Sequence, residues 1–280
     1  MRNNSDRMGL GANPDDGSNL QSEVVPPSVE GMQFVVPTEL VDLPTKGLFY
    51  DEGHPLHHAK TLEIRHMTTK EEDILTNQSF IKNGTVLDRL LQSIIVDKNI
   101  RVKDLYIGDK NALLVASRVY GYGPEYSSKV ACPSCGHQER YEFDLSDLEH
   151  IDYEANIEKH NATCDYENKS IFLTVPRTKA KLELRLLKDD PTTKNKKSNT
   201  IVALYKRIIK SVNGISDPSY IEGYVNSMAA VDSRYLRGVY SKLIPNIDFN
   251  ASFECSNCGT VSNLEVPLNA EFFWPDADLY

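Results

Sequence analysis

The sequence of 280 residues has no long hydrophobic run. A helix that spans a bilayer needs about 18 consecutive apolar residues, and the N-terminal stretch MRNNSDRMGLGANPDDGSN lacks the apolar segment of a secretory signal. We therefore expect neither a transmembrane segment nor a signal peptide. Glycine and proline are also few, at 15 and 14 residues, which excludes collagen-like and low-complexity chains.

The chain also lacks an excess of positive charge, because 31 basic residues stand against 40 acidic ones and the net charge is -9. A protein that binds nucleic acid through its whole surface needs a positive field, so this class is not expected. Hydrophobic residues at 40% and charged residues at 25% are ordinary for a globular protein. The length allows one large domain or two modest ones, and the expected partners are proteins.

Cysteine is scarce, but four of the five cysteines form two C-x-x-C-G motifs. These four are Cys132, Cys135, Cys255 and Cys258. A C-x-x-C turn directs both sulfurs to one side, and the following glycine lets the backbone curl so that amide groups point at the thiolates. Two such turns supply the four sulfurs that tetrahedral Zn²⁺ accepts. Since four thiolates leave no open position, we expect a structural zinc ion rather than a catalytic one.

The spacing of the two motifs is unusual, and it leaves alternatives open. Zinc ribbons usually separate their pairs by roughly 15–20 residues, whereas 119 residues, positions 136 to 254, intervene here. The ribbon would therefore carry a domain-sized insertion. The alternative is two independent thiol pairs, free or redox-active, although a redox C-x-x-C normally lies at a helix start. His137, or His160 with Cys164, could replace a ligand, but a surface histidine and a free thiol are the favoured interpretations.

Weaker candidates lie elsewhere in the chain. His54, His57 and His58 form a polar cluster that could bind a metal, yet such clusters are usually solvated. No Ser/His/Asp or Cys/His arrangement has supporting context, so we do not expect an enzyme. A basic stretch could contact phosphate, although a solvated face or an acidic protein partner is favoured; it comprises Lys188, Lys194, Lys196, Lys197, Lys206, Arg207 and Lys210.

Hydrophobic periodicity predicts an α+β fold. One helix should start at Thr68 or Thr69, where a capping box fits. The other predicted helices start near Thr85 and Gly108 and cover about 200–212, 220–229 and 232–245. Strands are predicted at 61–66, 170–175 and 179–187, and in two hairpins that carry the cysteine motifs, 126–131 with 139–145 and 251–254 with 262–266. Residues 146–169 carry only weak signals of structure.

These elements define five predicted regions. They are an extended N-terminal arm at 1–40, a helical segment with short strands at 41–125, a split zinc ribbon at 126–145 and 250–267, an inserted α+β region at 146–249, and an aromatic and acidic C-terminal tail at 268–280. The arm has too little apolar surface to offset its ordering entropy alone, so we expect it to contact another chain. Phe272, Phe273 and Trp274 should anchor the tail in its own core or in a neighbouring subunit.

Several motifs occur in a distinctive order along the chain. They are LPTKGLFY at 43–50, LEIR at 62–65, MTTKEEDILTN at 67–77, IVDKN at 95–99, IGDKNALL at 107–114, YGPEY at 122–126, the CPSCG motif, and FFWP at 272–275. This order resembles the baseplate protein family of T-even-like contractile-tailed bacteriophages, whose members act in the central baseplate hub. The resemblance implies a virion protein that is assembled in the host cytoplasm, binds other baseplate and tail proteins, forms part of a multimer in several copies, and has no catalytic residues.

The rival hypothesis is a zinc-ribbon factor that binds nucleic acid through the basic stretch. Such a ribbon should carry lysine and arginine beside its cysteines. The segments around Cys132 and Cys255 hold only Lys129 and Arg140, which favours the baseplate hypothesis.

Overall fold

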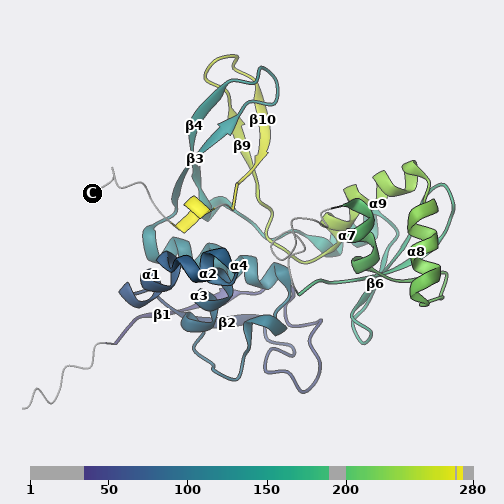
Figure 1. Cartoon of the computed structure of the whole chain (residues 1–280), viewed down its shortest axis with the longest axis horizontal. Helices are drawn as coiled ribbons and strands as arrows, with labels where there is room; N and C mark the ends of the chain where they lie inside the picture. The colour runs from purple at the N-terminus through teal and green to yellow at the C-terminus, as the bar shows by residue number, and fades with distance from the viewer. Residues whose placement is uncertain (1–34, 189–199, 269, 274–280) are drawn as a thin grey trace, which may run out of the picture. The chain divides into compact units, whose positions relative to one another are not determined.

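The computed structural model describes residues 35–188, 200–268 and 270–273 (Figure 1). Helices and short antiparallel strands are mixed along the chain, as the α+β prediction requires. The strands are β1 Thr38–Asp42, β2 Thr61–Arg65, β3 Glu125–Ala131, β4 Gln138–Asp144, β5 Thr163–Asp165, β6 Ser170–Thr174, β7 Lys181–Arg185, β8 Ile209–Val212, β9 Asn250–Glu254 and β10 Val261–Glu265. The α-helices are α1 Thr69–Thr76, α2 Gln78–Lys82, α3 Val86–Ile94, α4 Ile107–Tyr122, α5 Tyr153–Lys159, α7 Ile201–Ile208, α8 Pro218–Ser227 and α9 Ala230–Leu243, and the 3-10 helices are η1 Val102–Asp104, η2 Leu145–Asp147 and η3 Ala270–Phe273. None of the helices in these ranges is long and apolar enough to cross a membrane.

Three of the predicted helices correspond to α1, α3 and α4, and the structure adds the short helix α2 between the first two. The predicted capping box at the start of α1 is present, with Thr68 and Glu71 as its two members. Helix α3 buries Leu90, Leu91 and Ile94 on one face, as the helical spacing predicts.

The predicted arm overlaps the first strand. β1 begins at Thr38 and pairs antiparallel with β2 over its whole length, from Thr38 opposite Arg65 to Asp42 opposite Thr61. Residues 1–34, the greater part of the predicted arm, lie outside the described residues. The expectation that the arm contacts another chain therefore stays a prediction.

A four-stranded antiparallel sheet with the order β5-β6-β7-β8 forms the centre of the region between the two cysteine motifs. The prediction of one helix from 200 to 212 is wrong at its end, because Ile209–Val212 form β8 and pair with β7. Ile209 and Val212 are fully buried there, so sheet pairing outweighs the helical periodicity. Residues 146–169, which showed weak signals, contain α5 and β5.

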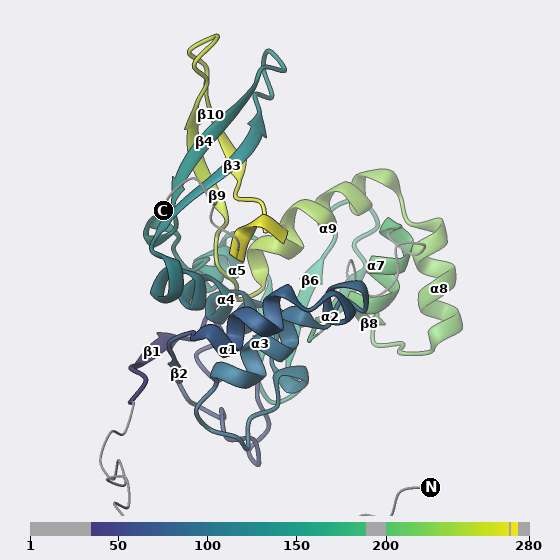
Figure 2. The same ribbon diagram turned by 60° about the vertical axis from the view of Figure 1, so that its left-hand side comes forward.

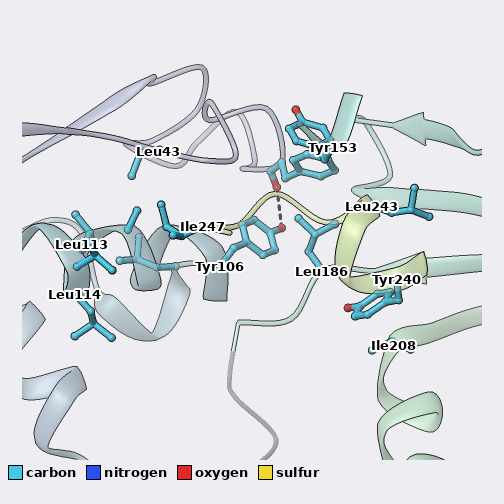
Figure 3. Close-up of a cluster of buried hydrophobic side chains, with 14 of the residues drawn as sticks. Leu43, Tyr106, Leu113, Leu114, Tyr153, Leu186, Ile208, Tyr240, Leu243 and Ile247 are labelled. Atoms are coloured by element: carbon cyan, nitrogen blue, oxygen red, sulfur yellow. Dashed lines mark hydrogen bonds between the residues drawn. The ribbon is translucent and has the colours of Figure 1, made fainter. Parts of the chain in front are cut away.

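One hydrophobic core joins the helical segment to the inserted region. Figure 3 shows Leu113 of α4 and Leu243 of α9 in the same buried cluster. Tyr106 lies between them and donates a hydrogen bond to the carbonyl of Phe49 at 2.8 Å. The core therefore runs without a break across the boundary predicted near residue 146.

A buried carboxylate connects the LPTKGLFY motif to α4. Asp109 is completely buried; it accepts hydrogen bonds from the Thr45 hydroxyl and from the Tyr50 hydroxyl, both at 2.7 Å, and from the Thr45 amide at 3.1 Å. Burial raises the pKa of Asp109 to about 6, although these donors favour its charged form. The network fixes the loop that precedes β2 against the start of α4.

Glu71 forms a second buried network, and it predicts a pH effect. Its burial opposes ionisation, but hydrogen bonds from Arg65, Ser93 and Thr68 lower the pKa of Glu71 to about 2. A carboxyl group with a lowered pKa stabilises the folded state above its unfolded pKa, near 4.5, and this contribution is lost as the pH falls toward 2. We expect Glu71→Gln to lower the free energy of unfolding at pH 6, with the difference from the wild type shrinking between pH 4.5 and pH 2.

Urea unfolding followed by circular dichroism at a series of pH values measures this difference. The control is Asp73→Asn, an exposed carboxylate in the same helix, which should leave the pH profile close to that of the wild type. A Glu71→Gln deficit that does not change between pH 6 and pH 2 would contradict the assigned role of the carboxylate.

Candidate metal centre

Two β-hairpins lie side by side and carry the cysteine motifs at their tips (Figures 1 and 2). One hairpin consists of β3 and β4, and the other of β9 and β10. Tyr141 of the first hairpin donates a hydrogen bond to the carbonyl of Ser252 in the second at 3.1 Å. Its ring meets that of Phe253 edge to face, with centroids 5.0 Å apart. The hairpins therefore pack through side chains, without a shared strand ladder.

The two turns that hold the cysteines have the same backbone geometry. In the first, the Gly136 amide donates to the Cys132 carbonyl at 2.9 Å; in the second, the Gly259 amide donates to the Cys255 carbonyl, also at 2.9 Å. The φ angles of the two glycines are +73° and +64°, a region that residues with a Cβ rarely adopt. The C-x-x-C-G pattern thus specifies each turn locally.

The fold brings the four sulfurs together. Cys132 Sγ lies 3.8 Å from Cys258 Sγ, and Cys135 Sγ lies 3.8 Å from Cys255 Sγ. All four sulfurs lie within 4.8 Å of one another. Four sulfurs bound tetrahedrally at about 2.3 Å from one Zn²⁺ are roughly 3.8 Å apart. These two pairs of sulfurs, each joining one motif to the other, therefore have the spacing that a shared ion requires.

The same distances count against the thiol-pair alternatives. A disulfide joins its sulfurs at about 2.0 Å, whereas the Cys132–Cys258 and Cys135–Cys255 sulfurs lie 3.8 Å apart. A redox-active C-x-x-C pair normally lies at the start of a helix, whereas both motifs here lie in hairpin turns. Moreover, sulfurs of different motifs approach one another to 3.8 Å.

Burial divides the four cysteines into an inner and an outer pair. Cys132 and Cys255 are buried beside Phe253, which is completely enclosed, while Cys135 and Cys258 are exposed. Val130, Tyr141 and Leu264 cover this small core. A core of so few side chains contributes little hydrophobic stabilisation to the tips of the hairpins.

Hydrogen bonding around the sulfur of Cys258 favours its thiolate form. The Thr260 hydroxyl lies 3.2 Å from Cys258 Sγ, and hydrogen bonding by Thr260 lowers the pKa of the Cys258 thiol to about 6. The Asn257 side-chain amide donates to Cys135 Sγ at 3.7 Å. Burial instead raises the pKa of Cys255 to about 12. A buried thiol of this kind is deprotonated when a metal ion binds it.

The other predicted ligands lie apart from this cluster. His137 is exposed beside the first motif, and Cys164 lies on β5, where burial raises the pKa of its thiol to about 11. His54 accepts a hydrogen bond from the Leu56 amide, and His57 is hydrogen-bonded to the Tyr50 carbonyl. Within the part of the chain that the structure describes, only the four cysteines group as metal ligands.

Most residues of the basic stretch either form ion pairs within the chain or lie outside the described residues. Lys206 pairs with Glu222, and Lys210 pairs with Glu183 at 2.7 Å. Lys194, Lys196 and Lys197 fall within 189–199, where the structure describes nothing. The lysines of α7 and β8 therefore neutralise acidic groups of the same chain.

Arg118, which the sequence analysis did not single out, connects α4 to the end of the hairpin pair that lies away from the cysteines. It is almost fully buried on α4 and donates to the carbonyls of Gly123, Glu125 and Phe272 at 2.6, 2.9 and 2.9 Å. It thereby joins α4, the start of β3 and the C-terminal helix η3. The sequence RVYGYG at 118–123 gives no local signal of the contact with Phe272.

The C-terminal aromatics pack in the chain's own core, one of the two predicted outcomes. Phe272 and Phe273 are buried, and Phe272 meets Tyr126 edge to face with ring centroids 5.2 Å apart. Tyr126 also donates a hydrogen bond to the Pro267 carbonyl at 2.9 Å. Trp274 lies outside the described residues.

A comparison with known protein families places most of the chain in one of them. The family model described as "T4 bacteriophage base plate protein" matches residues 49–274. No curated protein and no solved structure matches the chain. The matched range contains both cysteine motifs, Arg118 and the two buried C-terminal phenylalanines.

Proposed function

Because the chain belongs to the T4 bacteriophage base plate protein family, we propose that it is a structural protein of the central hub of a phage tail baseplate. In this proposal, a zinc ribbon stabilises its fold. The protein is assembled in the host cytoplasm, is present in several copies, and binds other baseplate and tail proteins in the virion. One observation supports the zinc part of this proposal. Two cysteine motifs that are separated by 119 residues bring their four sulfurs within 4.8 Å of one another.

The ion would act as a cross-link. Cys132, Cys135, Cys255 and Cys258 supply four thiolates, which complete a tetrahedral shell and leave no position for a substrate or water. The ion therefore closes the chain between the two hairpins and fixes both ends of the intervening region, residues 146–249. This role accounts for a metal centre in a protein for which we propose no reaction.

The five regions predicted from the sequence are proposed as its architecture. The arm at 1–40 and the tail at 268–280 are the two terminal regions of this architecture, and terminal segments of their composition are suited to contacts with neighbouring subunits. The continuous core between α4 and α9 supports treating the helical segment and the inserted region as one rigid unit, on which the ribbon projects.

The nucleic-acid alternative is less well supported. Lys129 and Arg140 stand directly opposite each other on β3 and β4, and the nearby Glu139 accepts a hydrogen bond from the Ser256 amide of the second hairpin at 3.1 Å. Two cations beside acidic residues form a poor phosphate-binding surface. Salt-dependent binding of the purified chain to DNA would favour this alternative over the baseplate proposal.

Quantitative mass spectrometry of purified phage particles tests the proposed location. In phage that encode this chain, we expect its peptides in isolated tails and baseplates at a fixed ratio to other tail proteins. The same peptides should be absent from purified heads. Absence from intact tails, with abundant protein in the infected cell, would contradict a structural role in the virion.

A further inference from the structure

The sheet β5-β6-β7-β8 has one face covered by side chains of its own core and one face bearing polar residues. Ile171, Leu173 and Leu182 point into the core and are buried. By the alternation of side chains along a strand, Phe172 of β6 and Glu183 of β7 point to the other face. This second face is hollowed by a cavity of about 570 Å³.

Backbone hydrogen bonds fix the turn at the edge of this hollow. Val212 and Ile215 exchange two backbone hydrogen bonds at 3.0 Å across the turn that contains Asn213 and Gly214. Asn213 is also tied to Lys181 through its backbone amide, which donates to the Lys181 carbonyl, and through its side-chain oxygen, which accepts from the Lys181 amide. These contacts hold the lining in place without a ligand, and the volume is in the range of binding pockets.

The lining combines positive charge with an exposed aromatic ring. Phe172 is 38% exposed and lines the cavity. Lys210 is neutralised by Glu183 and also donates to the Ser170 hydroxyl at 3.1 Å. Within the described residues, no carboxylate pairs with Lys181 on the opposite side of the hollow. The site therefore favours a ligand with both a carboxylate and an aromatic or aliphatic group.

The C-terminal sequence of the chain has this composition. Residues 274–280, WPDADLY, contain two aspartates, two aromatic residues and a leucine, with no lysine or arginine. The segment follows Phe273, which is buried at the ribbon base beside Phe272. In Figure 1 the helix η3 that ends at Phe273 lies well apart from β6 and the helices around it.

We propose that the hollow beside Phe172 and Lys181 binds residues 274–280 of a second copy of this chain. The aspartates pair with Lys181, and an aromatic side chain of the segment packs on Phe172. The separation of η3 from the sheet favours a second copy over the chain's own tail. The contact is heterologous, because residues 274–280 of one copy bind a different surface, the hollow, on the next copy. A contact of this kind joins copies head to tail into a ring or an open array. This inference rests on the proposed multimeric assembly and specifies one of its contacts.

The single tryptophan of the chain, Trp274, lies in the proposed ligand and reports on binding. In the full-length, zinc-loaded protein, we expect the tryptophan emission to shift to the blue as protein concentration rises, in parallel with the mass measured by light scattering. Lys181→Glu and Phe172→Ser should each weaken this association about tenfold or more. The matched control is Lys103→Glu, an exposed lysine on η1 outside the hollow, which should behave as the wild type.

A charge swap distinguishes direct pairing from an indirect effect. Chains that carry only Asp276→Lys and Asp278→Lys should not associate with themselves, whereas chains that carry these two substitutions together with Lys181→Glu should associate again. Emission that is independent of concentration, or association that survives both Lys181→Glu and Phe172→Ser, would overturn the proposal. Zinc content measured in the same samples should stay at one ion per chain, so failure of this contact is distinguishable from failure of the zinc centre.

Discussion

Cys258→Ser should abolish tight zinc binding and unfold the two hairpins at temperatures where the wild type is stable. Cys258 is exposed, and serine is nearly isosteric with it, so the substitution removes a ligand with little loss of packing. Binding of zinc to four thiolates contributes on the order of 10 kcal/mol in small zinc domains, which equals the stability of a whole domain. The loss of one thiolate removes much of this contribution and releases the chain between the hairpins.

Zinc content by elemental analysis and thermal unfolding by calorimetry measure this effect. Cys164→Ser is the matched control, because Cys164 lies on β5 outside the cluster; it should retain one zinc per chain and lose at most about 2 kcal/mol. In the phage, Cys258→Ser should yield soluble, protease-sensitive protein and incomplete baseplates, with no infectious particles. Normal tails that contain the mutant protein without zinc would refute the cross-link role.

Arg118→Met should cost on the order of 3 kcal/mol in the free energy of unfolding, because the three carbonyls that the guanidinium binds lose a charged donor in a buried site. These carbonyls belong to Gly123, Glu125 and Phe272. Methionine fills part of the same volume, so the effect reports on the hydrogen bonds more than on a cavity. The C-terminal segment, which α4 holds through Phe272, should become the first site of proteolysis.

Urea unfolding gives the free-energy change, and limited proteolysis with mass spectrometry locates the released segment. Arg237→Met, at an exposed position of α9, controls for the general effect of replacing a helical arginine and should change stability by less than about 0.5 kcal/mol. Zinc binding should persist in Arg118→Met, since no cysteine is altered. A loss below 1 kcal/mol, with the C-terminus as resistant as in the wild type, would contradict the anchoring role.

The sequence predicted the cysteine turns well because their geometry is local. A glycine after C-x-x-C is required where φ is positive, and both Gly136 and Gly259 have such angles. Whether the two turns meet depended on the 119 residues between them. The four-cysteine pattern predicted that the two turns share one ion, but no local pattern encodes the distance between the ends of an inserted region, so the 3.8 Å spacing of the sulfurs came from the folded chain.

Errors in the predicted elements arose where tertiary pairing decides the structure. Ile209 and Val212 continue the apolar spacing of α7, but their burial against β7 makes them a strand. Helix α5 has a capping aspartate, Asp152, which accepts from the Ala155 amide at 3.0 Å. With only seven residues, α5 is too short to show a clear period.

A local sequence pattern marked some of the buried charged residues, whereas others had no such pattern. The capping box marked Glu71 in the sequence, although its pairing with Arg65 and Ser93 did not follow from it. Asp109 and Arg118 gave no signal, because Tyr50, which binds Asp109, and Phe272, which binds Arg118, lie in other segments of the chain. Long-range polar contacts of this kind depend on the fold that they stabilise.

X-ray absorption spectroscopy at the zinc edge, on the full-length chain purified without added metal, tests the central claim most directly. The account predicts one zinc per chain with four sulfur neighbours at about 2.3 Å, and loss of this shell in Cys258→Ser but not in Cys164→Ser. A chain that folds with its four cysteines as free thiols or disulfides and without bound metal, or a zinc shell dominated by nitrogen and oxygen, would contradict it.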